Sequence, residues 1–286
     1  QVSGYTTTIN TDHPGNVIIT NKHEPETVTV SGTKTWNDKN NQDGIRPESI
    51  VVNVLRDGQE FMAKKVKADN DGKWHYEFTD LPKYHQGREI TYTVTENSVE
   101  GYTPSVKGYD IENSHTPDKT SFFVSKSWDD ENNQDGKRAK SVWVQLYAND
   151  KKQGKEIELS EGNNWQYQWA DLELNESGEK ITYQAKEVTQ VSGYETDINN
   201  DLPGNSLITN THVPETVTIF GEKTWNDKDN QDGVRPESIV VNVLQNGQEF
   251  AAKKVKPNKD GKWLYEFKNL PKYHQEKEIK YTITDQ

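Results

Sequence analysis

The sequence contains no cysteine among its 286 residues, which excludes disulfide bonds, thiol nucleophiles and thiolate metal ligands. It has no run of about 20 apolar residues, so we expect no membrane-spanning helix. Basic residues are outnumbered, with 34 Lys and Arg against 46 Asp and Glu. The resulting net charge of −12 makes nucleic acids and anionic membranes unfavourable partners. We recognise no signal peptide and no wall-sorting tail, and Gln1 looks like a cut site rather than a biological start.

Apolar residues are also scarce, at 30% of the chain, and the mean hydropathy is −1.06. The chain nevertheless carries 8 Trp, 13 Tyr and 7 Phe, which a disordered chain would lack. These two facts together predict several small domains, each with a thin core carried by aromatic side chains.

An internal repeat organises the whole chain. Residues 26–97 align with residues 215–286 without a gap, and residues 2–21 match residues 191–210. A more diverged half-repeat lies between them, because SKSWDDENNQDGKR (125–138) resembles TKTWNDKNNQDGIR (33–46). The long period is therefore a pair of related domains. We predict four segments: a last-strand segment of a truncated or split unit (1–24), two complete domains (25–116 and 117–213), and a domain without its last strand (214–286).

The local patterns predict β-strands throughout. Residues 27–36, 49–55, 73–78 and 89–96 alternate or are rich in β-forming residues, and residues 37–44, 56–59 and 70–73 carry turn signals. No segment has a helical period. Several short strands in each unit predict an all-β fold of tandem sandwiches. Pro25, Pro117 and Pro214 follow the last strand of each unit and mark short, stiff linkers.

Three polar positions recur in each unit at equivalent places in the pattern. The first is the lysine of a KxW motif, the second is an acid that ends a strand led by tyrosine, and the third is an asparagine that closes the last strand. They are Lys34, Lys126 and Lys223; Glu96, Glu187 and Asp285; and Asn21, Asn113 and Asn210.

The KxWxD…NQDGxRP opening, the YxxxE…GY element and the terminal ITN resemble those of Cna B-type domains, over essentially the whole chain. The resemblance implies an inverse immunoglobulin-like sandwich. It also implies a spontaneous isopeptide bond between the lysine and the asparagine, assisted by the acid. The bonds implied are Lys34–Asn113 with Glu96, and Lys126–Asn210 with Glu187.

The chemistry is reasonable for a buried site. Burial keeps a lysine amine neutral and nucleophilic, and it keeps a carboxyl protonated, so that the carboxyl can polarise an amide and transfer a proton. The simpler interpretation is that the lysine extends to solvent and the asparagine caps a turn. The recurrence of all three positions, together with the resemblance to Cna B-type domains, favours the covalent interpretation.

The two ends of the chain complement each other. Residues 1–21 match a last strand, and the 214–286 unit has Lys223 and Asp285 but no asparagine after them. We therefore expect that one molecule can complete another head to tail, by adding its strand to an open sheet edge. Lys223 would then bond Asn21 of the neighbour, with Asp285 as the acid. Aspartate is one methylene shorter than glutamate, which leaves its reach open.

We expect no metal and no other cofactor. The NQDG loops suggest calcium, but the first ligand position holds Lys39, Glu131 or Lys228, and a lysine there contradicts an EF-hand. The seven histidines do not form a metal-ligand spacing. Trp36, Trp128 and Trp225 lie two residues after the lysines and share their face of the strand, so we place them in the core.

The resemblance implies an extracellular stalk or spacer, anchored to the cell wall of a Gram-positive bacterium, that carries an adhesive domain. Its partners would be the neighbouring repeats of the same chain. A binding module for a host matrix protein or glycan is the alternative. A hydrolase is disfavoured because no nucleophile–base pair recurs, and any bond formation would occur once per domain without turnover. We expect this chain not to bind collagen.

Overall fold

The computed structural model describes residues 1–286 and divides into two compact units. The first unit comprises residues 1–120 and 173–181, and the second comprises residues 121–172 and 182–286. The expectation of an all-β fold is confirmed, since the single helix is the three-residue 3-10 turn Glu161–Asn163. No helix in the structure has the length or the apolar character needed to cross a membrane.

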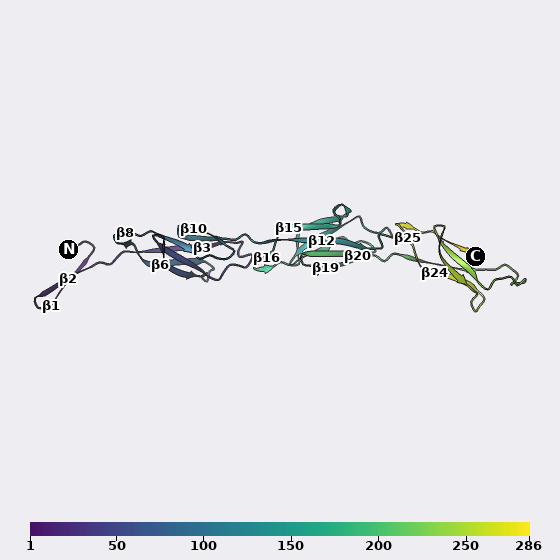
Figure 1. Cartoon of the computed structure of the whole chain (residues 1–286), viewed down its shortest axis with the longest axis horizontal. Helices are drawn as coiled ribbons and strands as arrows, with labels where there is room; N and C mark the ends of the chain where they lie inside the picture. Colours follow the sequence, from purple (N-terminus) through teal and green to yellow (C-terminus); the bar gives the residue numbers. More distant parts are fainter. The chain divides into compact units, whose positions relative to one another are not determined.

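The first unit contains a hairpin, a two-sheet sandwich and two short hairpins (Figure 1). Its strands are β1 (Thr6–His13), β2 (Asn16–Lys22), β3 (Thr27–Asn37), β4 (Ile50–Arg56), β5 (Gln59–Val66), β6 (Trp74–Pro82), β7 (Tyr84–His85), β8 (Arg88–Glu89), β9 (Tyr92–Glu96), β10 (Thr103–Lys107), β11 (Asp110–Ser114), β16 (Asn175–Glu176) and β17 (Glu179–Lys180). One sheet of the sandwich has the order β10-β11-β3-β6, and the other has the order β5-β4-β9.

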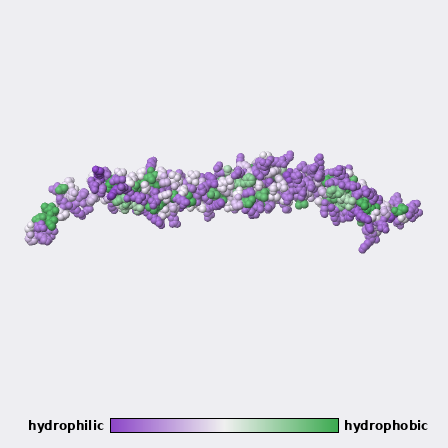
Figure 2. Space-filling model, in the orientation of Figure 1, coloured by the Kyte–Doolittle hydropathy of each residue, from purple (hydrophilic) through white to green (hydrophobic).

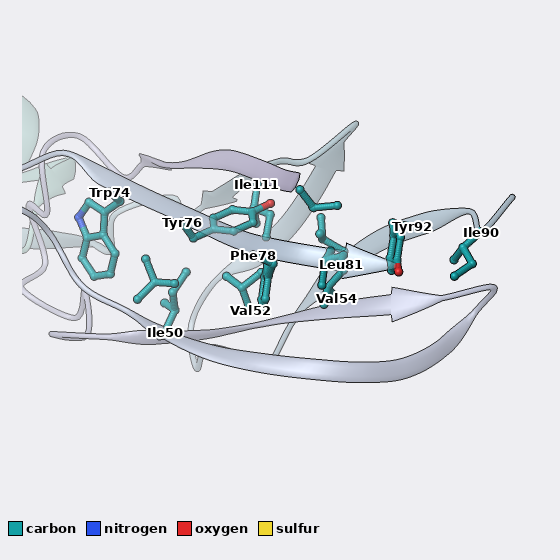
Figure 3. Close-up of a cluster of buried hydrophobic side chains, with 13 residues drawn as sticks. Ile50, Val52, Val54, Trp74, Tyr76, Phe78, Leu81, Ile90, Tyr92 and Ile111 are labelled. Atoms are coloured by element: carbon teal, nitrogen blue, oxygen red, sulfur yellow. The ribbon is translucent and has the colours of Figure 1, made fainter. Parts of the chain in front are cut away.

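Period-2 alternation places the core of this first sandwich between its two sheets. On β6, Trp74, Tyr76 and Phe78 are buried, whereas His75 and Glu77 are exposed. Side chains of β6 and β4 meet between the sheets (Figure 3): Trp74, Tyr76, Phe78, Ile50, Val52 and Val54. Trp36 packs against this cluster, as the sequence predicts.

The last strand of the sandwich runs parallel to the first. On β11, Ile111 is paired with Lys34 of β3, and Asn113 is paired with Trp36. Two strands from opposite ends of the domain sequence therefore lie side by side. This pairing brings the lysine of one strand and the asparagine of the other to the same part of the sheet.

The second unit contains a second sandwich and a third, smaller arrangement. Its strands are β12 (Lys119–Asp129), β13 (Ser141–Ala148), β14 (Lys151–Ser160), β15 (Gln166–Glu173), β18 (Tyr183–Glu187), β19 (Glu195–Asn199), β20 (Asn205–Thr211), β21 (Thr216–Lys223), β22 (Ile239–Gln245), β23 (Gln248–Val255), β24 (Trp263–Pro271), β25 (Tyr273–His274), β26 (Lys277–Glu278) and β27 (Tyr281–Asp285). A few terminal residues of β12 and β15 fall in the first unit.

The second sandwich repeats the topology of the first. Its sheets have the orders β15-β12-β20-β19 and β14-β13-β18. The parallel pair is β12 with β20, in which Lys126 is paired with Ile208 and Trp128 with Asn210. The lysine and the asparagine are therefore offset by the same two residues as in the first sandwich.

The third arrangement has the sheets β21-β24 and β23-β22-β27, together with the short β25-β26 hairpin. It has its own core, which includes Val241, Val243 and Trp263. Here β21, the strand that carries Lys223, is paired with β24 alone.

Candidate functional site

Lys34 and Glu96 meet in the interior of the first sandwich. Lys34 lies on β3 and Glu96 on β9, and their side chains are 0% and 1% exposed. Lys34 Nζ is 3.7 Å from Glu96 Oε1, which is too long for a hydrogen bond. The amine instead donates to the backbone oxygen of Thr35 at 3.1 Å. This geometry is not that of a tight ammonium–carboxylate pair.

Asn113 is fully buried on β11, two residues after the partner of Lys34, and its side chain interacts with Glu96. Neither Asn113 Oδ1 nor Asn113 Nδ2 has a hydrogen-bond partner, and Glu96 Oε1 has none either. Unsatisfied buried polar groups are rare, and each one costs about 1–3 kcal/mol. The Asn113 amide nevertheless acts on Glu96, because its interaction with the carboxyl opposes the rise in the pKa of Glu96.

Burial shifts the amine and the carboxyl in opposite directions. It lowers the pKa of Lys34 to about 8, although Glu96 opposes the shift. It raises the pKa of Glu96. Both shifts increase the neutral fraction of the amine and of the carboxyl relative to the same groups in water.

The second sandwich has the same site. The side chains of Lys126 and Glu187 are 0% and 2% exposed, with 3.9 Å between Lys126 Nζ and Glu187 Oε2. Burial lowers the pKa of Lys126 to about 8 and raises that of Glu187. Asn210 is fully buried and donates to Glu187 Oε1 at 2.9 Å, while its own Oδ1 has no partner. Each of the two predicted triples is thus brought together in one dry interior.

The remaining predicted residues have different surroundings. Lys223 Nζ is 2.6 Å from Asp285 Oδ2, and the two side chains are 30% and 48% exposed. The hydrogen bond from Lys223 lowers the pKa of Asp285, so this pair is ionic. Asn21 lies on the exposed hairpin β1–β2 and accepts a hydrogen bond from Thr7 at 2.6 Å.

The structure also reveals partners that the motif reading missed. Asp38 is buried, binds the Arg46 guanidinium through Nε and Nη2, and accepts from the Tyr102 hydroxyl. These residues lie in the DxxNQDGxRP and GY motifs, whose local patterns indicate a turn. The signal that could have identified them is the repetition of the same three residue types, as Asp130, Arg138 and Tyr194.

No group of three or more His, Asp or Glu side chains gathers where it could hold a metal ion. His115 and His212 contact single carboxylates, Asp43 at 2.7 Å and Asp135 at 2.8 Å.

Comparison with known families now identifies the fold that holds these triples. The model of the Cna protein B-type domain matches residues 30–114, 122–211 and 219–286. The chain belongs to this family. The matches lie inside the predicted segments 25–116, 117–213 and 214–286, whose bounds themselves stay a prediction. Each of the two sandwiches described above is thus a Cna B-type domain with one triple in its interior.

Similar proteins come from Staphylococcus aureus. The chain is 47% identical to a collagen adhesin over 285 residues, which is 100% of this chain and 24% of that protein. The crystal structure of two B repeat units of the S. aureus collagen-binding protein matches with a TM-score of 0.56 and 46% identity, covering 91% of this chain and 69% of that one. A single B repeat unit matches with a TM-score of 0.33 and 44% identity, over 66% of this chain and 100% of that one. This chain spans about a quarter of the adhesin's length, so only that part of the adhesin is matched.

Proposed function

We propose that the chain is a series of structural spacer domains from the surface of a Gram-positive bacterium, stiffened by isopeptide bonds. Lys34 joins Asn113 and Lys126 joins Asn210, each within its own Cna B-type domain. The observation that carries this proposal is the burial of Lys34, Glu96 and Asn113 in one sandwich, repeated in the second sandwich by Lys126, Glu187 and Asn210.

The reaction is an amide exchange. The neutral Lys34 amine attacks the side-chain carbonyl carbon of Asn113, and a new C–N bond forms as the old one to Nδ2 breaks. The protonated Glu96 carboxyl hydrogen-bonds the carbonyl oxygen and relays a proton from the attacking amine to the departing nitrogen. One ammonia leaves, and the carboxyl is regenerated.

The site supplies the conditions that this reaction needs. The amine is held next to the amide by the β3–β11 pairing, so the two groups react at high effective concentration. The side chains of Lys34 and Glu96 are shielded from water, which favours their neutral forms. Because the product bond persists, each domain reacts once, and we expect maturation rather than enzymatic turnover.

Peptide mapping tests the assignment directly. After digestion under denaturing conditions, we expect one branched peptide that joins Lys34 to Asn113 and a second that joins Lys126 to Asn210. Lys34→Met should abolish the first branched peptide and leave the second unchanged. Recovery of only linear peptides from the unmodified chain would refute the proposal.

The third lysine supports a separate, intermolecular proposal. The strand β21 is paired only with β24. Its equivalent in the second sandwich, β12, is also paired with β20 of the hairpin β19–β20. The exposed hairpin β1–β2 corresponds in sequence to that hairpin. The hairpin carries exposed apolar residues (Figure 2): Ile9, Val17, Ile18 and Ile19. We propose that this hairpin adds to β21 of a second copy, where Lys223 meets Asn21 with Asp285 as the acid. Such a head-to-tail contact does not close and would build a chain of molecules.

Concentration-dependent light scattering tests the association, and a denaturing gel tests the bond. For the unmodified chain, we expect multiples of the monomer mass in light scattering and a ladder of multiples on the gel. Lys223→Met should lose the ladder on the gel but still associate in light scattering. A monomer at all concentrations would overturn the contact, and a single band despite association would overturn only the bond.

The spacer role is distinguished from a binding role by a direct assay. The S. aureus relative is named a collagen adhesin, and the matched structure is of its B repeat units. We propose that this chain holds an adhesive domain away from the cell wall and does not itself bind collagen. Immobilised collagen should therefore retain no more of this chain than immobilised albumin does. Saturable retention would favour the alternative, a matrix-binding module.

A further inference from the structure

Each of the three tryptophans that follow the lysines contacts a lysine amine and an arginine guanidinium with its ring system. In the first domain, Lys34 Nζ lies 4.2 Å and the Arg46 guanidinium carbon 5.4 Å from the centre of the Trp36 ring system. The edges of the indole meet Trp74 and Tyr102 at centroid distances of 5.3 and 4.9 Å. The indole Nε1 is buried without a hydrogen-bond partner. The indole is therefore fixed by its stacking contacts rather than by a hydrogen bond.

Arg46 is itself held in one orientation. Its Nε and Nη2 donate to the two oxygens of Asp38 at 3.0 and 2.6 Å, a fork geometry that lysine cannot reproduce. Asp38 also accepts from the backbone N–H of Asn41 at 2.9 Å and from the Tyr102 hydroxyl at 2.8 Å. Tyr102 precedes the β10–β11 hairpin that carries Asn113. The cluster thus links the start of the domain to its last hairpin.

The second domain repeats every contact. Lys126 Nζ and the Arg138 guanidinium carbon lie 3.9 and 5.7 Å from the centre of the Trp128 ring system. Asp130 binds Arg138 and accepts from Tyr194 at 2.8 Å.

The third arrangement has the tryptophan and the arginine without the tyrosine. Trp225 is stacked with Lys223 at 4.9 Å and with Arg235 at 5.6 Å, but no tyrosine contacts Asp227 there. The Asp227 side chain is 27% exposed, against 1% for Asp38 and 0% for Asp130. Its lysine is also the one that is exposed and paired with an ionised carboxylate.

We propose that Arg46, Asp38 and Tyr102 are positioning residues that hold Trp36 as a cover over the Lys34 amine, with Arg138, Asp130 and Tyr194 doing the same for Trp128 and Lys126. The cover closes when the last hairpin docks, because Tyr102 arrives with it. The amine is thereby shielded only after the asparagine strand is in place. This inference rests on the proposed isopeptide bond and assigns the residues that control when the amine becomes reactive.

Burial is the largest cause that lowers the pKa of Lys34, ahead of any charge. The charges that face the amine oppose one another: Glu96 of β9 and Glu112 of β11 favour the ammonium form, and Arg46 disfavours it. Opening the cover should therefore act mainly by letting water reach the amine, which raises its pKa towards 10.5, the ordinary value. Each unit of that rise reduces the neutral fraction at neutral pH roughly tenfold.

The test measures the rate of bond formation against pH. Chains are made in a short pulse of cell-free translation, transferred to buffers below and above pH 8, quenched in denaturant, and digested. The two branched peptides are then quantified over time. In the unmodified chain, both rates should rise with a midpoint near the Lys34 and Lys126 pKa of about 8.

Arg46→Gln should move the midpoint of the Lys34–Asn113 reaction to higher pH and slow it roughly tenfold at neutral pH. The Lys126–Asn210 peptide of the same molecules should keep its midpoint, which provides an internal control. Tyr102→Phe retains the ring and removes only the bond to Asp38, so a smaller shift in the same direction is expected even if Arg46→Gln does not fold.

The positioning role would be overturned if Tyr102→Phe leaves the midpoint unchanged and Arg46→Gln either leaves it unchanged or does not fold. That result would leave the isopeptide proposal intact. Absence of both branched peptides from the unmodified chain would overturn the isopeptide proposal and this inference with it.

Discussion

A carboxyl next to a lysine has opposite properties at the buried and the exposed sites of this chain. Glu96 is 1% exposed, and burial raises its pKa, whereas Asp285 is 48% exposed, and its bond to Lys223 lowers its pKa. The distances are consistent with this difference. The amine nitrogen lies 3.7 Å from the carboxyl oxygen at the first site, beyond hydrogen-bond range, and 2.6 Å from it at the third. Solvent access therefore accounts for the opposite directions in which the pKa of the two carboxyls is shifted.

Replacing the acid tests its chemical role. Glu96→Gln keeps the shape and the hydrogen-bonding capacity of the side chain but cannot relay a proton. We expect the Lys34–Asn113 bond to be absent and the Lys126–Asn210 bond to be present. The variant should therefore have lost one ammonia relative to its own sequence, where the unmodified protein has lost two. Circular dichroism should report an unchanged β-fold. Complete bond formation in Glu96→Gln would rule out a proton-transfer role for Glu96.

A second titratable pair lies where the first domain ends. His115 Nδ1 is 2.9 Å from the Gly101 oxygen and His115 Nε2 is 2.7 Å from Asp43 Oδ2, so both ring nitrogens face acceptors. Only the imidazolium can donate to both. The hydrogen bond to Asp43 raises the pKa of His115 above 6.5, and the charges nearby are those of Asp43 and Asp118.

The sign of the pH effect follows from that shift. A group whose pKa is raised by folding stabilises the fold fully below its unfolded value of 6.5 and loses that contribution as the pH rises through the folded value. We expect the free energy of unfolding of the first domain to fall over that window, and His115→Gln to remove this part of the pH dependence. Urea unfolding at a series of pH values measures both, and identical pH profiles for the two proteins would contradict the assignment.

Among the elements, the long alternating strands were predictable and the weakly patterned ones were not. The sequence predicts residues 27–36 and 73–78 as strands, and the structure has β3 at Thr27–Asn37 and β6 at Trp74–Pro82. It does not predict β5, because seven of its eight residues are exposed and no buried face shows in the pattern. Local patterns are informative only where burial alternates.

The site was predictable as three residue types but not as a geometry. Repetition singles out Lys34, Glu96 and Asn113, yet their meeting depends on the parallel pairing of β3 with β11, which no local pattern specifies. The contact of Arg46 with Trp36 is not predictable from the sequence, because an arginine before a proline in a turn-rich loop has the pattern of a surface residue. Both contacts join residues that are distant in the sequence, so local patterns do not predict them.

The proposed Lys34–Asn113 bond should stabilise the first domain by joining its first strand to its last. A bond between β3 and β11 closes a loop of about 80 residues, which by chain entropy is equivalent to roughly 4–5 kcal/mol if it acts as a disulfide does. Lys34→Met removes the bond without leaving a buried charge. We expect Tm of the first domain to fall by several degrees or more, since ~1 kcal/mol corresponds to ~4–8 °C in a domain of this size.

Lys223→Met is the matched control, because Lys223 lies outside the first domain and its pair with Asp285 is exposed. The Tm of the first domain should be nearly unchanged in the monomeric variant. Equal melting curves for Lys34→Met and the unmodified chain would show that no clamp stabilises the first domain.

At the scale of the whole molecule, the proposed bonds would change how the chain responds to force. A domain whose first and last strands are joined covalently transmits a pull across the bond, and the residues between Lys34 and Asn113 cannot extend. In single-molecule pulling, Lys34→Met should release about 80 residues, roughly 280 Å of extra length. The same extension for the two proteins would argue against a mechanical role of the bond.

The intact mass of the unmodified chain tests the central claim most directly. Each Lys–Asn bond expels one ammonia, so the account predicts a mass lower than that of the full sequence by two ammonia molecules, measured on monomer under denaturing conditions. Lys34→Met and Lys126→Met should each have lost one ammonia relative to their own sequences. A mass equal to that of the full 286-residue sequence would contradict the account.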